Sequence, residues 1–226
     1  MLGEILAVDL TMPTNQRTAA DPSIEKNTRN AFDISILSAQ HKAIRRLKRS
    51  APTPSIHGNK SWGSSYLLMD FLQHNPPPQG ARIMELGCGF GLAGIHCAKA
   101  YNAHVLAIDA DPAVFPFLQL QAQHNGVDIE TQQQYFETIT LEQLAPIDVL
   151  IASDICFWDT LAETVAALVD RACEAGVSRI VIADPERPPF FEMANDAMQE
   201  HYGELFQWRV AQPQRASGCI LLIENA

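Results

Sequence analysis

From about residue 81 onward, short apolar runs alternate with longer stretches in which apolar residues recur every three to four positions. The short runs are typical of buried β-strands, and the longer period is typical of helices that pack one face on a sheet. Strands and helices that alternate in this way form a parallel sheet with helices on both faces. The pattern therefore predicts an open α/β domain.

Seven segments have the length and composition of strands: 82–86, 104–109, 129–136, 147–153, 177–183, 205–210 and 219–223. The fourth is apolar at nearly every position, which is typical of a central strand. Helices are predicted between strands over 92–101, 112–125, 159–175 and 191–202, with Gly126 and Gly176 ending the second and third. The last two strands have no helix between them, so we expect them to pair antiparallel at one edge.

Residues 1–60 lie outside this alternation. They show a helical signal near Phe32 to Arg49 and then a Pro-rich stretch, residues 51–54. We interpret 1–60 as an extension that caps the carboxyl edge of the sheet, and 61–226 as the main domain.

Composition places the chain among ordinary globular proteins, with 226 residues, 47% hydrophobic and 19% charged. The first nine residues carry acids instead of the bases of a secretory signal, and no apolar run approaches the length of a membrane span. We therefore expect a cytoplasmic protein that contacts no membrane. The five cysteines are scattered without a Cys-x-x-Cys pair, so we expect free, mostly buried thiols and no structural metal.

The formal net charge of −10 disfavours general nucleic-acid binding, which depends on Lys and Arg. Residues 41–50, however, hold five Lys or Arg and no acid, while the rest of the chain has 11 bases and 26 acids. The stretch is either the solvated face of a helix buried through Ile44 and Leu47, or a surface that steers an acidic partner.

A glycine-rich turn follows the first strand, at Gly87, Gly89 and Gly91. In open α/β sheets such a turn lets a ligand approach the next helix at the carboxyl ends of the strands. Glu85 precedes the turn, and Asp109 closes the next strand, where a carboxylate can accept both hydroxyls of a ribose. Two acids with this turn favour S-adenosylmethionine (SAM), whose amino-acid end is positively charged.

Two alternatives bear on this turn. Residues 89–94 also satisfy the Gly-x-Gly-x-x-Gly pattern of NAD sites, but a dinucleotide pattern begins directly after its strand, and in that frame Leu92 occupies the position of the third glycine. Asp111 competes with Asp109 for the ribose. We assign Asp109 to the ribose and Asp111, which precedes Pro112, to a helix cap.

Residues 60–224 resemble the seven-β-strand, class I SAM-dependent methyltransferases, which implies a Rossmann-like, mostly parallel sheet with an antiparallel edge strand. After the fourth strand, Asp154 to Phe157 is similar to the Asp-x-x-Tyr/Phe motif of protein-lysine methyltransferases. After the fifth, residues 184–187 are similar to the Asp-Pro-x-Arg segment of the electron-transfer-flavoprotein β-subunit lysine methyltransferases, with Glu186 where glycine is usual.

The resemblance implies a role for each motif residue. Asp154 would orient the substrate amine between Phe157 and Trp158, while Asp184 and Arg187 would line the opposite wall. The implied cofactor contacts are Trp62, Glu85, Gly87, Gly89, Gly91, Asp109, Ala110, Tyr135, Phe136 and Ser153. Tyr135-Phe136 stands where many relatives place Asp-Trp beside the adenine.

Each of these roles has a structural alternative. Asp154 can instead bind loop amides, Asp184 and Arg187 can form an internal ion pair, and the aromatic residues can be core or anchor side chains. The resemblance thus implies methylation of a lysine in a protein substrate. The alternatives are a small-molecule N-methyltransferase similar to nicotinamide N-methyltransferase, and a SAM-binding protein without turnover.

Overall fold

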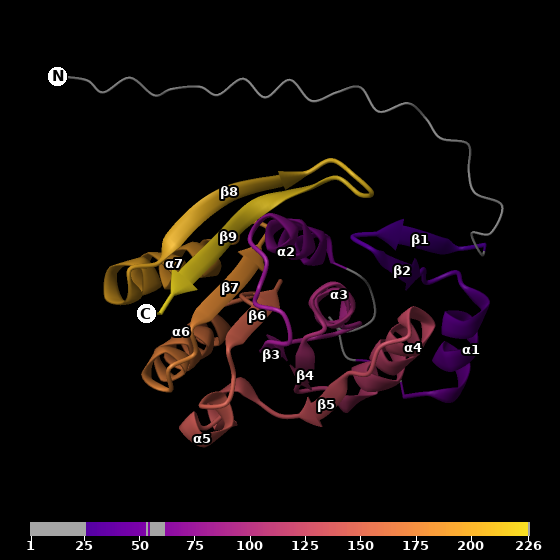
Figure 1. The fold of residues 1–226 in the computed structure, drawn as a ribbon, viewed down its shortest axis with the longest axis horizontal. Helices are drawn as coiled ribbons and strands as arrows, with labels where there is room; N and C mark the ends of the chain where they lie inside the picture. The colour runs from indigo at the N-terminus through magenta and orange to yellow at the C-terminus, as the bar shows by residue number, and fades with distance from the viewer. Residues whose placement is uncertain (1–25, 53, 55–61, 226) are drawn as a thin grey trace.

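The computed structural model describes residues 26–52, 54 and 62–225. A seven-stranded sheet forms its centre, in the order β5-β4-β3-β6-β7-β9-β8 (Figure 1). The strands are β3 (Arg82–Leu86), β4 (His104–Asp109), β5 (Glu130–Gln133), β6 (Val149–Ser153), β7 (Arg179–Asp184), β8 (Glu204–Val210) and β9 (Ala216–Glu224). The predicted α/β fold class is confirmed.

The order of the strands reverses beside β3. The chain runs from β3 outward to β4 and β5, and then returns to pair β6 with the other side of β3, all in parallel register. A crevice opens at such a reversal, outside the carboxyl ends of the strands, because the two flanking connections leave in opposite directions.

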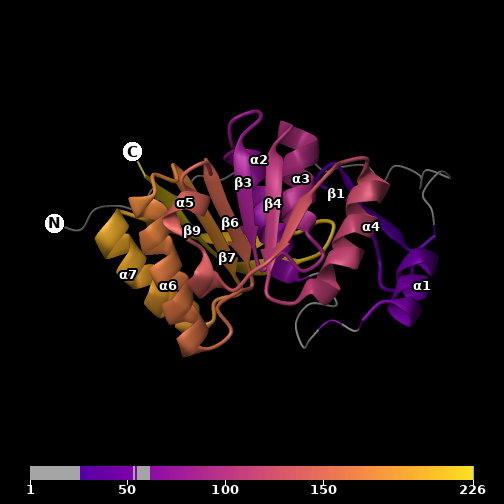
Figure 2. The same ribbon diagram turned by 90° about the horizontal axis from the view of Figure 1, so that it is seen from below.

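Helices cover both faces of the sheet (Figure 2). One face carries α2 (Gly63–His74), α3 (Leu92–Tyr101) and α4 (Phe115–Asn125), and the other carries α5 (Leu141–Leu144), α6 (Asp159–Glu174) and α7 (Pro188–His201). Short 3-10 helices, η1 (Pro112–Val114) and η2 (Phe136–Thr138), follow β4 and β5. A separate hydrophobic core therefore lies on each side of the sheet.

The end of the sheet that contains β8 and β9 differs from the sequence prediction in one respect. β8 and β9 do pair antiparallel, but β9 is inserted between β7 and β8 and is the strand that runs against the others. Residues 219–221 of β9 are all buried, whereas β8 is only partly buried along most of its length. A strand that is apolar on both faces is suited to the interior of a sheet, and the more polar strand to its edge.

The N-terminal extension begins with a hairpin. β1 (Thr28–Ala31) pairs with β2 (Ile34–Leu37), and α1 (Lys42–Ser50) follows. The predicted helix from Phe32 to Arg49 is therefore wrong in its first part. Phe32 and Asp33 both adopt positive φ, 48° and 62°, which matches the tight turns that join two strands.

The hairpin is fastened to the outer sides of α3 and α4. Gln121 exchanges two hydrogen bonds of 2.9 Å with the backbone of Leu37, and a ring nitrogen of His96 lies 2.8 Å from the carbonyl oxygen of Phe32. The described part of the extension thus packs on helices of the main domain. The boundary at 60 and 61 stays a prediction, since residues 55–61 lie outside the described residues.

Helix α2 has no counterpart among the predicted elements. Seven of its twelve residues are buried, including Tyr66 and the run Leu67 to Met69, and it packs against β7, β8 and β9. A helix that is apolar on most sides lacks the periodic pattern by which amphipathic helices are recognised.

Candidate functional site

A cleft with a volume of about 330 Å³ lies at the carboxyl edge of the sheet. It is formed by the segments that follow β3, β4, β5 and β6, together with the start of α2. Its lining includes twelve of the predicted site residues: Trp62, Gly87, Gly89, Gly91, Asp109, Ala110, Tyr135, Phe136, Ser153, Asp154, Phe157 and Trp158. Glu85, Asp184 and Arg187 are not part of the lining.

The glycine turn gives the cleft its floor. Gly89 and Gly91 have φ values of 51° and 68°, in the left-handed region that side chains disfavour. A Cβ atom at Gly91 would lie 2.6 Å from the Leu118 side chain, so that position is filled by packing. A Cβ atom at Gly89 would meet nothing within 4 Å, because Gly89 faces the open cleft.

Asp109 holds the turn and faces the cleft. One carboxylate oxygen accepts a hydrogen bond from the Gly89 amide at 3.1 Å, and the other accepts from the Asp111 amide at 2.9 Å. Burial raises the pKa of Asp109 above its ordinary value, and these two hydrogen bonds act in the opposite direction. The Asp111 side chain accepts from the Ala113 amide at 2.9 Å and caps η1, as predicted from the sequence.

Glu85 lies behind the turn instead of in the cleft. Its side chain is 4% exposed, and one oxygen accepts a hydrogen bond from the Gly94 amide in the first turn of α3 at 3.2 Å. Burial raises the pKa of this carboxyl to about 8, although the hydrogen bond from Gly94 favours its charged form. Direct contact between Glu85 and a cofactor stays a prediction.

Asp154 belongs to a network of charges that joins three segments. One of its oxygens lies 2.6 Å from a terminal nitrogen of Arg187, and the other accepts from the Ser64 amide at 3.3 Å. Arg187 also binds Asp184, at 2.8 Å through its side chain and 2.7 Å through its backbone amide. This three-residue network, Asp154, Arg187 and Asp184, ties the segments after β6 and β7 to the start of α2.

Asp184 is fully buried, and burial raises its pKa to about 6 against the opposing influence of Arg187. The structure therefore contains the internal ion pair that was one of the two interpretations of Asp184 and Arg187. Of the three members of the network only Asp154 lines the cleft.

Glu186, which stands where glycine is usual in the resembled family, has an unusual backbone conformation. Its φ is 73°, a region in which glycine is favoured and other residues cost roughly 1 to 2 kcal/mol. A glycine at this position would adopt the same conformation without that cost. In this chain the Glu186 carboxylate lies 3.8 Å from the Cys219 thiol of β9.

Aromatic residues form one wall of the cleft. The rings of Trp62 and Phe157 meet edge to face, 5.7 Å apart, and those of Phe157 and Trp158 are 5.9 Å apart. The Arg187 guanidinium lies 4.5 Å from the centre of the Phe157 ring and thus supports this wall from outside the cleft. Trp158 is 50% exposed, and Tyr135, which also lines the cleft, is 57% exposed.

Sequence reasoning missed several residues of the lining. Cys88 and Phe90 lie within the glycine turn itself, and Ile155 lies within the Asp-x-x-Phe motif. Their positions inside these two motifs could have identified them as lining residues. Ser65 lies in the same short segment as the predicted Trp62, residues 62–65, and its hydroxyl lies 3.1 Å from that of Ser153. The remaining missed residues are Leu92, Glu137 and Leu161, and the lining also includes Asp111, which the sequence assigned to a helix cap.

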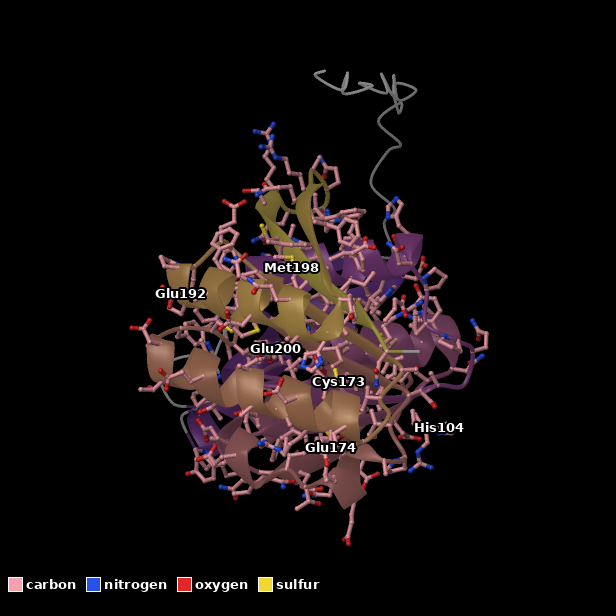
Figure 3. The ribbon with its side chains drawn as sticks, turned by 90° about the vertical axis from the view of Figure 1, so that its left-hand side faces the viewer. His104, Cys173, Glu174, Glu192, Met198 and Glu200 are labelled. Atoms are coloured by element: carbon pink, nitrogen blue, oxygen red, sulfur yellow. The ribbon has the colours of Figure 1, made fainter. Side chains whose placement is uncertain are left out.

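The five cysteines are free and four are buried, as predicted. Asp170, Glu200 and His201 bring ligand atoms within 4.8 Å of one another between α6 and α7, and His201 contacts Asp170 at 2.7 Å. Figure 3 labels Glu200 on α7 and Cys173 and Glu174 on α6. None of the three residues of this group lines the cleft.

No helix among the described residues is both long enough and apolar enough to cross a bilayer.

Comparison with known proteins matches residues 83–176 to a family described as "Methyltransferase domain". The electron transfer flavoprotein beta subunit lysine methyltransferase of Xenopus laevis is 24% identical over 157 residues, covering 63% of each chain. The ubiquinone biosynthesis O-methyltransferase of Xylella fastidiosa is 31% identical over 87 residues, covering 38% of this chain and 35% of the relative. The chain therefore spans between a third and two thirds of these relatives.

Among solved structures, magnesium protoporphyrin IX methyltransferase from Synechocystis PCC 6803 with bound SAH matches with a TM-score of 0.54. The match has 13% sequence identity and covers 83% of this chain and 96% of that one. At this identity the match establishes a common fold.

Proposed function

We propose that this chain, a class I SAM-dependent methyltransferase by its fold and its domain match, transfers a methyl group to a lysine side chain of a protein. Its cofactor is S-adenosylmethionine. The proposed acceptor is supported by the similarity to the Xenopus laevis lysine methyltransferase and by the position of Asp154 beside an aromatic wall in the cleft.

The charge of the cleft is the observation that carries the proposal. Among its described lining residues there are four acids, Asp109, Asp111, Glu137 and Asp154, and no Lys, Arg or His. SAM has a sulfonium and an ammonium, so acids favour it, whereas the pyrophosphate of NAD would meet carboxylates without a compensating base. The lining also suits a substrate amine.

The residues of the cleft fit SAM in detail. Gly89 leaves backbone open to the ligand, and Asp109 ends β4 with its carboxylate at the cleft, where it can accept from ribose hydroxyls. Tyr135, Phe136 and Trp62 provide apolar surface for the adenine and methionine portions. When bound, SAM supplies a methyl group on an already electrophilic sulfonium.

The protein must then bring a neutral amine in line with that methyl group and exclude water. Correct orientation contributes roughly 7 to 11 kcal/mol in favourable cases. Deprotonating a lysine with an ordinary pKa near 10.4 costs about 4 to 5 kcal/mol at pH 7.

Asp154 suits this task because it is already paired. A lone carboxylate would hold the amine in its charged form, but Arg187, at 2.6 Å, offsets much of the charge on Asp154. The oxygen of Asp154 can therefore orient an amine with less stabilisation of the ammonium. Phe157 and Trp158 exclude water and provide cation-π surface while the amine enters.

The test is incubation of the purified chain with methyl-labelled SAM and a desalted lysate, with and without added metabolite extract. Asp109→Ala serves as the cofactor-deficient control. Label in protein that mass spectrometry assigns to lysine supports the proposal. Label confined to small molecules, or to other residues, contradicts it.

The similarity to the ubiquinone biosynthesis O-methyltransferase favours a second candidate, methylation of a small molecule. That similarity covers 38% of this chain and 35% of the relative, less than the 63% of each chain covered by the Xenopus laevis lysine methyltransferase. Label in the metabolite fraction alone would support this candidate.

A further inference from the structure

Helix α1 presents a set of exposed bases, and the one side-chain hydrogen bond described for them, from Arg49 Nε to the carbonyl oxygen of Arg45 at 3.2 Å, lies within the helix itself. Arg45, Arg46, Lys48 and Arg49 are all exposed, and none forms an ion pair with a described residue. The helix packs through other side chains, the buried Ile44 and the partly buried Leu47. We refer to these four residues as the α1 basic surface.

Folding of the helix does not account for these charges. Lys48 and Arg49 lie in the last turn, where bases complement the helix dipole, but Arg45 and Arg46 lie in the middle. Arg45 and Arg49 are four positions apart, a spacing at which like charges repel and weaken a helix. The first turn has no acid to offset them. An acidic ligand would relieve this repulsion.

A groove accompanies the α1 basic surface. It lies between α1 and α4 and has a volume of about 520 Å³. Its lining comprises Ala43, Arg46, Leu47, Ser50, Pro116, Gln119, Leu120 and Gln123. The described lining of the groove contains no acid, its apolar part comes from both helices, and its polar groups include a guanidinium and two amides.

The cleft and the groove are lined by neighbouring parts of the chain, the end of β4 and helix α4. Figures 1 and 2 show α1 along the outer side of α4, at the end of the molecule opposite β8 and α7. The α4 residues of the groove begin at Pro116, five positions after Asp111, which lines the cleft. The groove is thus lined by the helix that begins shortly after this cleft residue.

We propose that the α1 basic surface and its groove bind an acidic segment of a partner protein. The identity of the partner rests on the proposed function: the partner is then the protein substrate. Its acidic segment lies at a distance from the methylated lysine. Binding there raises the local concentration of the lysine at the cleft.

Two other classes of partner fit the observations less well. A helix that lies on a membrane needs its apolar face free, and α1 uses Ile44 and Leu47 for packing. A nucleic acid would extend beyond one nine-residue helix onto a molecule with 26 acids. A short acidic peptide meets only the basic surface.

The direct test uses a fluorescein-labelled peptide of alternating Glu and Gly, twelve residues long, and measures binding by anisotropy without SAM. The variant is Arg45→Glu/Arg46→Glu. The matched control is Arg209→Glu/Arg215→Glu, which changes the charge equally at exposed positions on the β8 and β9 hairpin. Circular dichroism establishes that both variants are folded.

We expect the wild type to bind the peptide at low salt, the α1 variant to bind at least tenfold more weakly, and the control to remain within about twofold of the wild type. No binding by the wild type, or equal losses in both variants, overturns the proposal. Tighter binding of oligo-dT or of phosphatidylserine vesicles than of the peptide, lost in the same variant, overturns it in favour of those partners.

This readout needs no turnover, so it stands or falls separately from the methylation assay. One outcome is that the α1 variant labels lysine with the same KM for the protein substrate as the wild type. That result would support the proposed function and show that the substrate does not bind the α1 basic surface.

Discussion

Asp109 combines two tasks at the carboxyl end of β4, since its oxygens hold the glycine turn and also face the cleft. A hydrogen bond to a charged group contributes roughly 1.5 to 3 kcal/mol, so Asp109→Ala is expected to weaken SAM binding about tenfold or more in calorimetry. Asp148→Ala is the control, because Asp148 binds the Arg82 amide at the start of β3, away from the cleft. Equal affinity in both variants would remove Asp109 from the cofactor site.

Gly89 can be tested against a second glycine of the same conformation. Gly89 and Gly126 have φ values of 51° and 70°, and an added Cβ atom at either meets nothing within 4 Å. Alanine at each site should therefore cost a similar stability, on the order of 1 kcal/mol. Only Gly89→Ala should weaken SAM binding, at least tenfold, since only Gly89 lines the cleft. Normal SAM binding by a folded Gly89→Ala variant would mean that the ligand lies elsewhere.

The raised pKa of Glu85 predicts that the stability of the fold depends on pH. Its pKa is about 8 in the folded chain and about 4.5 when unfolded, so between these values the folded chain binds the additional proton. The free energy of unfolding should therefore fall as pH rises from 4.5 to 8. At about 1.4 kcal/mol per unit, the loss between pH 5 and 8 is roughly 2 to 4 kcal/mol.

Glu85→Gln should remove this loss, and Glu130→Gln, at an exposed position on β5, should retain it. Urea unfolding at several pH values measures the difference. Parallel curves for the wild type and Glu85→Gln would contradict the assignment.

The glycine turn and Asp109 lie at the cleft where residue types placed them, because the turn and the carboxylate each follow the carboxyl end of a parallel strand. Their contact with a cofactor stays a prediction. Residue types did not place Glu85 behind the turn, since a strand sequence locates a residue without deciding which neighbour its side chain meets. For Glu85 that neighbour is the backbone of Gly94, nine positions later.

At the scale of elements, the network of Asp154, Arg187 and Asp184 connects the segments after β6 and β7. Asp154→Asn and Asp184→Asn each remove one carboxylate from Arg187, but only Asp154 lines the cleft. If Asp154 orients the amine, Asp154→Asn should lower kcat about 100-fold and leave SAM affinity within about threefold. Asp184→Asn should lower stability while kcat falls much less.

The comparison requires kcat, SAM affinity and melting temperature for both variants. Similar kcat losses in the two would assign Asp154 to the network alone. A large loss of SAM affinity in Asp154→Asn, at preserved stability, would assign it to the cofactor.

The elements themselves were largely predictable. β3, α3 and β4 have the bounds expected from their apolar runs and glycine punctuation. The hairpin of β1 and β2 was not predicted, because its apolar residues from Ile34 to Leu37 precede the α1 pattern without a glycine or proline between them. The network was beyond prediction in detail, since it joins Ser64, Asp154 and Arg187 from three distant segments.

For the whole molecule, ligand binding should appear as thermal stabilisation. A ligand that binds only the folded state at 100 times its Kd adds about 2.7 kcal/mol. For a chain of this size that corresponds to roughly 5 to 10 °C in Tm. SAM or S-adenosylhomocysteine should produce this shift in a thermal unfolding assay and NADH should not. A shift with NADH alone would contradict the cofactor.

The interior position of β9 determines when the sheet can be completed during folding. Ala216–Glu224 follows every other described strand in the sequence, yet its place is between β7 and β8. Until these residues pair, β7 has an open edge and β8 has no partner. Open strand edges are the part of a sheet that pairs with other chains. Folding intermediates in which β9 has not yet paired are therefore expected to be the forms most prone to aggregation.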